Sequence, residues 1–471
     1  MTATLKSRKS YSSRKIHCST KKRRKHKGGN VIAAGSFGCV FRPSLTCENS
    51  DESMSKSSDS LVSKLGDKTE IKSEYDMMVK LHRILMTIPD SSALYGLNVS
   101  KPCIPSKLSS SDLVDFDKKC KLKDISEENV NDVDVLPTLS FIDMPYGGVS
   151  LLHWIRDGKL DPVNSYVSFI HGASHLIRRG IVPMNRKGVL HNDIHARNIL
   201  VKNDNDETTN DNDDTSNGKD DKLGFLRMSL IDWGLAVTNT NTSMKKIAVQ
   251  IDYPITRIFF VVKEKKPLMQ FVRTTFRMKN ITEYTYYSSS PDVKRKVYEI
   301  LLKVCFELVM LSQHNEKESV VNLYRQRDIL FKSVLYENKV YTDTYIPFLR
   351  RYISTYQESG DNSSILYDKG ITFTSFLYTM YLADMMHKYL EIKNSEITLK
   401  FRKYFSDIYR FNADVYAMSN CIILGTSKRD GLSGDTYNNS YSLAKLLLEE
   451  VFLMSTEVID FTKLCNKLDN L

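Results

Sequence analysis

The spacing of apolar residues in the first third of the chain predicts a small β unit followed by one helix. Residues 31–41, VIAAGSFGCVF, have strand-type residues on both sides of a glycine-containing turn. The apolar side chains of residues 68–85 recur at helical spacing; they are Ile71, Tyr75, Met78, Leu81 and Leu85. A further strand is expected over residues 136–142. We therefore expect antiparallel strands packed with an amphipathic helix.

Helical patterns dominate the remainder of the chain. Helices are expected over residues 151–155, 165–177, 293–314, 373–391 and 411–424, with closing helices over 442–471. The stretch from residue 259 to residue 410 is rich in Tyr, Phe and Leu at helical spacing, which predicts a helical subdomain of about 140 residues. The expected fold class is α+β, with a small antiparallel β part and a larger helical part.

Four polar segments interrupt these patterns. Residues 1–29 and the acidic stretch 203–222 have too few apolar residues to offset their ordering entropy, so both are expected to be disordered. The Ser-rich residues 44–60 predict a lengthened hairpin turn. Residues 86–135 are polar and irregular, and we interpret them as a long connection within the β part.

Composition limits the class of protein. With 471 residues, 41% hydrophobic and 26% charged, the chain is typical of a globular protein. No apolar run approaches the length of about 18 residues needed to span a membrane, and the N-terminus lacks the apolar core of a signal peptide. The eight cysteines show no C-x-x-C spacing, which favours reduced thiols in a cytoplasmic or nuclear compartment, without disulfides or a zinc site.

The net charge of +11 resides in the N-terminal tail. Residues 1–27 contain eleven Lys or Arg and no acid, so the other 56 basic residues balance the 56 acidic ones. The basic tail, chiefly residues 6–27, could bind nucleic acid or an acidic protein surface, or act as a nuclear-localisation signal. The alternative interpretation is a solvated tail that only increases solubility.

The candidate chemistry lies in two short motifs. Residues 190–201 read LHNDIHARNILV and place the carboxylate of Asp193 five residues before the amide of Asn198. Residues 230–236 read LIDWGLA and supply a second carboxylate, Asp232, before a glycine. Phosphoryl transfer needs such groups, because one carboxylate can accept the proton of an attacking hydroxyl and other oxygens can hold Mg²⁺.

These motifs resemble those of the protein-kinase superfamily, whose catalytic loop reads H-R-D-x-x-x-x-N and whose metal motif reads D-F-G. The resemblance implies that Asp193 is the base and that Asn198 and Asp232 are metal ligands. Asn192 replaces the usual Arg, and His195 stands where Ser/Thr kinases have a Lys. His195 would then take part of that lysine's role. The H-x-D-x-H pattern also resembles the loop of aminoglycoside and choline-type kinases.

The same resemblance implies an ATP site. The nucleotide-binding residues would come from a glycine loop, a strand lysine and an interlobe hinge; they are Ala33, Gly35, Ser36, Phe37, Gly38, Val40, Lys64, Met144 and Tyr146. Ala33 replaces the first loop glycine. An acid on the helix over residues 68–85 would pair with Lys64; Glu74 is the first choice and Glu70 the second.

The resemblance also implies a two-lobed kinase-like fold. Residues 30–143 would form the small lobe and residues 144–471 the large lobe, with the helical insertion at about 262–408. Asp414 in FNADVYAMSNCIIL would lie beneath the catalytic loop and accept backbone N–H bonds. Ile255 follows Pro254 where kinases have the Glu of A-P-E, so the usual ion pair closing this segment is missing. Such degenerate motifs and large insertions resemble the kinases of large cytoplasmic DNA viruses, which would also allow association with virions.

Three functions remain open at this level. The first is an ATP- and Mg²⁺-dependent protein kinase, most simply Ser/Thr-specific, catalysed by Asp193, His195, Lys64 and Glu74. The second is a small-molecule phosphotransferase, which the H-x-D-x-H loop and the missing A-P-E glutamate favour. The third is a pseudokinase scaffold in which the helical insertion binds a partner.

Overall fold

The computed structural model describes most of the chain between residues 30 and 471. The described residues are 30–35, 38–48, 60–159, 163–202, 226–238, 253–254, 262–313, 328, 330–331, 334–357, 373–427 and 435–471. The predicted disordered segments 1–29 and 203–222, together with Ser36 and Phe37, lie outside this set. Within it the protein is a mixed α+β structure with antiparallel sheets, as the apolar pattern predicted.

The N-terminal sheet has four antiparallel strands in the order β1-β2-β3-β4. They span Asn30–Gly35, Gly38–Arg42, Leu61–Asp67 and Leu139–Pro145. The fourth strand begins three residues later than predicted, because residues 136–138 form a short helical turn, η1 (Leu136–Thr138). A register shift between Val31 and Ala33 then places Ala33 opposite Val40.

The two faces of this sheet pack on different layers. Phe41, Leu65 and Phe141 face a core formed with residues 108–130, including Phe116 and Val130. Residues 86–135 are therefore more than the irregular connection that their polarity suggested, because their apolar side chains cover this face. The segment contains two short helices, α2 (Ser91–Leu94) and α3 (Phe116–Lys119).

Two disulfides join the sheet to this covering layer. Cys39 is bonded to Cys120, and Cys47 is bonded to Cys103. The prediction of reduced thiols without disulfides is wrong for these four residues, because the fold brings together cysteines that are 81 and 56 residues apart in the sequence. Cys305, Cys421 and Cys465 are buried thiols that are not part of these disulfides. The cysteines therefore give no support to a reducing compartment.

The helix α1 (Lys68–Leu85) covers the opposite face and has the predicted bounds. Asp67 caps it by accepting hydrogen bonds from the backbone N–H groups of Thr69 and Glu70. Ile71, Met78 and Leu81 are buried with Ile142 in the main core. The face of the sheet that carries Lys64 is thus directed toward this helix.

Shorter strands and helices connect the sheet to the helical part. The chain continues through β5 (Val149–Ser150), α4 (Leu151–Arg156), α5 (Val163–His175), the π-helical turn η2 (Leu176–Ile181) and α6 (Val182–Arg186). Strands β5, β7 (Ile199–Lys202) and β8 (Arg227–Leu230) form one sheet, and β6 (Val189–Leu190) pairs with β9 (Val237–Thr238). Gly148 has a φ of +100°, and a Cβ there would lie 2.0 Å from the carbonyl oxygen of Val201. This glycine is required for the close approach of β5 to β7.

The remaining chain is mostly helical. Its helices are α7 (Val262–Met278), α8 (Glu283–Tyr286), α9 (Pro291–Gln313), η7 (Val340–Tyr345), α11 (Ile346–Gln357), α13 (Phe373–Tyr389), α14 (Phe401–Tyr404), η8 (Phe405–Tyr409), α15 (Arg410–Ser427), α16 (Asp435–Leu447), η9 (Leu448–Phe452) and α17 (Phe461–Leu468). The region 262–408 is not purely helical, since β10 (Leu390–Lys393) and β11 (Glu396–Leu399) form a hairpin. Asn394 and Ser395 both have positive φ at its turn, which suits a tight hairpin.

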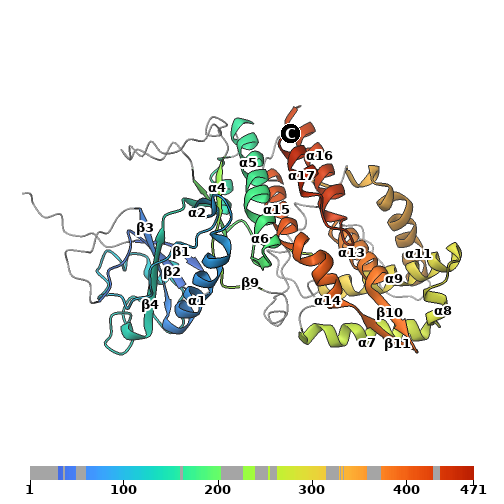
Figure 1. Cartoon of the computed structure of the whole chain (residues 1–471), viewed down its shortest axis with the longest axis horizontal. Coiled ribbons are helices and arrows are strands. Elements are labelled where there is room, and N and C mark those ends of the chain that lie inside the picture. Colours follow the sequence, from blue (N-terminus) through green and yellow to red (C-terminus); the bar gives the residue numbers. More distant parts are fainter. Residues whose placement is uncertain are drawn as a thin grey trace, which may run out of the picture.

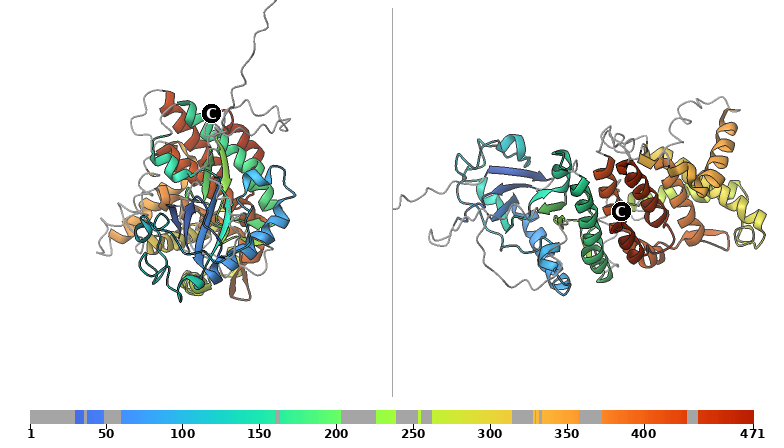
Figure 2. Two further views of the ribbon diagram at one scale, coloured as in Figure 1. Left: turned by 90° about the vertical axis from the view of Figure 1, so that its left-hand side faces the viewer. Right: turned by 90° about the horizontal axis from the view of Figure 1, so that it is seen from above.

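The elements are arranged along one long axis. The four-stranded sheet and α1 lie at one end, α5, α6 and α15 lie in the middle, and α8, α9 and α11 lie at the other end (Figures 1 and 2). One continuous apolar core runs from α1 through α5 and α15 to α17. Among the described residues, no helix is long and apolar enough to cross a membrane.

Candidate active site

A buried carboxylate fixes the loop of residues 190–198, which we call the HND loop. Asp414 is fully buried on α15 and accepts hydrogen bonds from the backbone N–H groups of His191 at 2.9 Å and Asn192 at 3.1 Å. Asn185 donates a third bond from its side chain, at 2.9 Å. These bonds compensate for burying the charge of Asp414 and hold Asn192 at a φ of 64°. Asp414 therefore has the position and the bonds that were predicted for it.

His191 is a buried structural member of the loop. Its Nε2 lies 3.0 Å from the carbonyl oxygen of Ile231, and its ring lies 4.5 Å from that of Trp233. Burial lowers the pKa of His191 to about 4, so the ring is neutral near pH 7 and Nε2 carries the proton donated to Ile231. His191 thus joins the HND loop to the strand end that carries Asp232.

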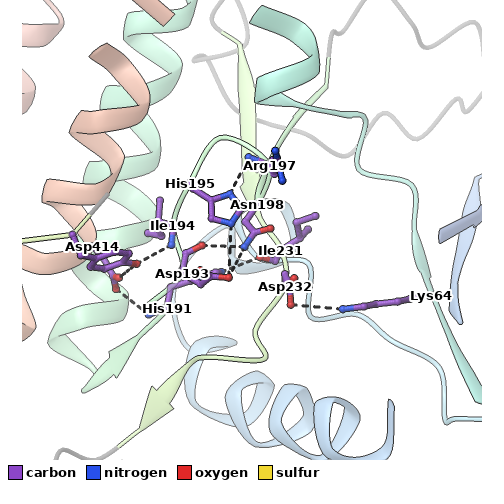
Figure 3. A network of polar contacts seen from close by, with 11 residues as sticks. Lys64, His191, Asp193, Ile194, His195, Arg197, Asn198, Ile231, Asp232 and Asp414 are labelled. Atoms are coloured by element: carbon purple, nitrogen blue, oxygen red, sulfur yellow. Dashed lines mark hydrogen bonds and ion pairs between the residues drawn. The ribbon is translucent and has the colours of Figure 1, made fainter. Parts of the chain in front are cut away.

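Asp193, His195 and Asn198 lie together in this loop (Figure 3). The side chains of Asp193 and His195 are partly exposed, and Asn198 is buried. The Asn198 amide donates to the backbone oxygen and to Oδ2 of Asp193, both at 3.0 Å. With both amide hydrogens used, Asn198 Oδ1 is the atom left to bind a metal. His195 Nε2 lies 3.9 Å from Asp193 Oδ2. His195 Nδ1 accepts a bond from the backbone N–H of Arg197, so Nε2 carries the hydrogen that faces Asp193.

Lys64 extends from β3 to meet two carboxylates. Its Nζ lies 2.7 Å from Glu74 Oε1 and 3.6 Å from Asp232 Oδ1. Burial alone would lower the pKa of Lys64, but Asp232 and Glu74 outweigh it and raise that pKa above its ordinary value. Burial also raises the pKa of Glu74, more than Lys64 lowers it. The partner of Lys64 on α1 is thus Glu74, as first chosen, while Glu70 lies on the first turn of the helix.

Several of the predicted nucleotide residues share one face of the sheet. Strand pairing places Ala33 beside Val40, Val40 beside Lys64, and Val62 beside Met144. Paired residues of antiparallel strands project to the same side. The small and apolar side chains of Ala33, Val40 and Met144 therefore lie on the face of the sheet that carries the Lys64 ammonium.

Two predicted nucleotide residues have other roles in the structure. A Cβ on Gly38 would lie 2.2 Å from the carbonyl oxygen of Leu65, so this glycine is required for the packing of β2 on β3. The backbone N–H of Tyr146 donates to Ser60 at 2.7 Å, and its ring lies under the Arg42 guanidinium, 3.5 Å away. The backbone N–H of Tyr146 thus already has an acceptor within the protein. Gly35 ends β1, where the described strand stops.

Two residues that hold the site together were not predicted from the sequence. The Tyr253 hydroxyl donates to Asp414 Oδ1 at 2.9 Å and accepts from the backbone N–H of Ile194 at 2.7 Å. Asn185, at the end of α6, is the other. Both bond to Asp414 across more than 150 residues of sequence, so no local pattern could identify them.

The chain matches no known protein-family model and no curated protein sequence. Its function is therefore inferred from the geometry of the site.

Proposed function

We propose that the protein is an ATP-dependent protein kinase that transfers the γ-phosphate to a Ser or Thr hydroxyl, and that its fold is a two-lobed kinase-like fold. The observation that carries the proposal is the Lys64 ammonium between Glu74 and Asp232, opposite the Asp193–Asn198 pair. A cation held by two carboxylates beside a further carboxylate and an amide suits a polyphosphate bound with a divalent ion. Residues 30–143 would form the small lobe and residues 144–471 the large lobe.

The donor set fits Mg²⁺. Among the described residues, no group of three or more His, Cys, Asp or Glu side chains is placed so that it could hold a metal ion. Asp232 Oδ1 or Oδ2 and Asn198 Oδ1 would supply two oxygen ligands, and Mg²⁺ commonly completes its shell with phosphate oxygens and water. The Asp232 side chain is 34% exposed, so a ligand can reach it. Bound Mg²⁺ would neutralise charge on the phosphates.

Each side chain then has a defined task. Asp193 accepts the proton of the attacking hydroxyl, and its carboxylate is oriented by the Asn198 amide. Lys64 binds the nucleotide phosphates, and Glu74 fixes the direction of its ammonium. His195 offers its Nε2–H toward the reacting groups, and this single imidazole donor takes only part of the role of a lysine ammonium.

A small-molecule phosphotransferase is the second candidate. His195 supports it, because an imidazole lies beside Asp193 where Ser/Thr kinases have a Lys. The two candidates share the same catalytic groups and differ only in the molecule that carries the accepting hydroxyl.

The proposal is tested with γ-labelled ATP and Mg²⁺ and a panel of basic proteins, acidic proteins, choline and aminoglycosides. Wild-type protein should label a protein substrate, whereas Asp193→Asn and Asp232→Asn should each lose nearly all transfer. Asp76→Asn, an exposed carboxylate on α1 paired with Lys72, is the matched control and should behave like wild type. Labelling of small molecules alone would favour the second candidate. Absence of transfer and of ATP binding would contradict both candidates, while ATP binding without transfer would indicate a pseudokinase.

A further inference from the structure

Tyr253 connects a distant part of the chain to the HND loop. It is fully buried, although it follows Asp232 by some twenty residues and precedes α7. Its hydroxyl lies 2.7 Å from the backbone nitrogen of Ile194, the residue directly after Asp193, and 2.9 Å from Asp414 Oδ1. One hydroxyl thus bridges the loop backbone and the carboxylate beneath it.

We propose that Tyr253 is a positioning residue, which anchors the end of the segment after Asp232 to the HND loop and fixes the backbone that carries Asp193. The proposal rests on the proposed function, because its consequence is the placement of the catalytic carboxylate. The sequence has Asn192 and not an arginine before Asp193, and Ile255 and not a glutamate after Pro254.

The hydrogen-bonding capacities of the groups explain why a tyrosine is suited to this position. Ile194 N–H needs an acceptor, and Asp414 Oδ1 needs a donor. A hydroxyl can serve both at once, and its bond to a buried carboxylate is charge-assisted. If the hydroxyl is removed, Asp414 Oδ1 keeps the bond from Asn192 N–H at 3.1 Å. Ile194 N–H, however, has no second acceptor among the described residues, so a buried donor next to Asp193 is left unsatisfied.

The test compares Tyr253→Phe with wild type by amide hydrogen exchange and by kinetics. Tyr286→Phe is the matched control, because Tyr286 is also a buried tyrosine whose hydroxyl bonds to backbone oxygens, those of Met386 and His387, but on α8. In Tyr253→Phe the peptide over residues 189–196 should exchange faster, and kcat should fall by about tenfold with an unchanged KM for ATP. Tyr286→Phe should change neither quantity.

The outcomes separate this proposal from the proposed function. Unchanged exchange and unchanged kcat in folded Tyr253→Phe would overturn the anchoring role, and faster exchange with unchanged kcat would overturn the catalytic part. If wild-type protein transfers no phosphate, the proposed function fails, and hydrogen exchange still decides the anchoring. If Tyr253→Phe does not fold, the exchange of the Ile194 amide in wild type decides: slow exchange supports the bond, and fast exchange overturns it.

Discussion

The Lys64 ammonium lies 2.7 Å from Glu74, and this buried ion pair joins the sheet to α1. The two side chains are only 12% and 10% exposed. Such a pair must be well bonded to offset its desolvation, and Asp232 supplies Lys64 with a second carboxylate at 3.6 Å. The position of α1 and the direction of the Lys64 ammonium are thus coupled, so a change at Glu74 should affect the proposed contact of Lys64 with phosphate.

Replacing Glu74 with glutamine should weaken catalysis without unfolding the protein. The amide keeps the size of the side chain but loses a charge-assisted bond worth about 1.5–3 kcal/mol, which corresponds to a loss of about tenfold or more in kcat/KM for ATP. Steady-state kinetics measure this. Glu70→Gln, on the first turn of the same helix, is the control and should leave kcat/KM unchanged. Equal effects of both substitutions would show that Glu74 acts only through the stability of the helix.

The free energy of unfolding should decrease in acid because of His191. Its folded pKa of about 4 is below the unfolded value near 6.5, so the unfolded chain binds more protons between these values. Stability from this group is therefore fully present above pH 6.5 and is lost as the pH falls toward 4, by about 3 kcal/mol in total. Urea unfolding of wild type and His191→Gln at pH 7, 5.5 and 4.5 tests this. The variant has no titrating ring, so it should show a smaller decrease, and parallel curves would refute the assignment.

The disulfide between Cys47 and Cys103 should stabilise the layer over the sheet. It closes a loop of 56 residues, and loss of such a cross-link commonly costs about 2–5 kcal/mol. The double variant Cys47→Ser/Cys103→Ser should therefore unfold at lower denaturant concentration than oxidised wild type. As a control, dithiothreitol should lower the stability of wild type more than that of a variant in which all four bonded cysteines are serine. Wild type that is insensitive to dithiothreitol would contradict the presence of the disulfides.

Gly38 should be required for folding rather than for nucleotide contact. An alanine there would place Cβ 2.2 Å from the Leu65 carbonyl, a backbone atom that can move only if β2 and β3 separate. Gly38→Ala should thus lower the melting temperature. Gly234→Ala is a useful comparison, since its Cβ would meet only Asp232 Oδ1 at an ordinary 3.5 Å. A Gly38→Ala protein with wild-type stability but weaker ATP binding would instead support the nucleotide role predicted for this glycine.

The sequence was informative where a role depends on local spacing. The helix over residues 68–85 followed from apolar periodicity, whereas the choices of Glu74 and Asp414 followed from the resemblance of local motifs to those of kinases. Tyr253 could not be found in this way, because it is one of 25 tyrosines and its role exists only through contact with Ile194 and Asp414. The cysteine pairs are likewise defined by tertiary proximity.

The β10–β11 hairpin illustrates a different limit. Its residues LEIKNSEITL do alternate, with Leu390, Ile392, Ile397 and Leu399 buried. This alternating strand pattern directly follows the long helical pattern of α13, so the sequence predicts a helix that continues to residue 391. Short strands that begin at a helix end are hard to recognise, because a few residues satisfy both periodicities.

The final prediction concerns the basic tail, residues 1–27, which lies outside the described residues. It carries eleven basic groups and no acid, and the rest of the chain is balanced, so binding to nucleic acid or to an acidic protein should depend on the tail and weaken with salt. A chain beginning at residue 29 should lose this binding but keep its KM for ATP, because the proposed nucleotide residues Lys64, Asn198 and Asp232 lie outside the removed segment.

A full-length variant with glutamine at the basic positions of residues 21–27 separates the effect of charge from the effect of chain length. It should bind as weakly as the truncated chain. Fluorescence anisotropy with single-stranded DNA, RNA and an acidic peptide over a salt series measures the binding. Equal salt-dependent binding by the truncated chain would place the basic site in the folded part, and a raised KM for ATP would make the tail part of the nucleotide site.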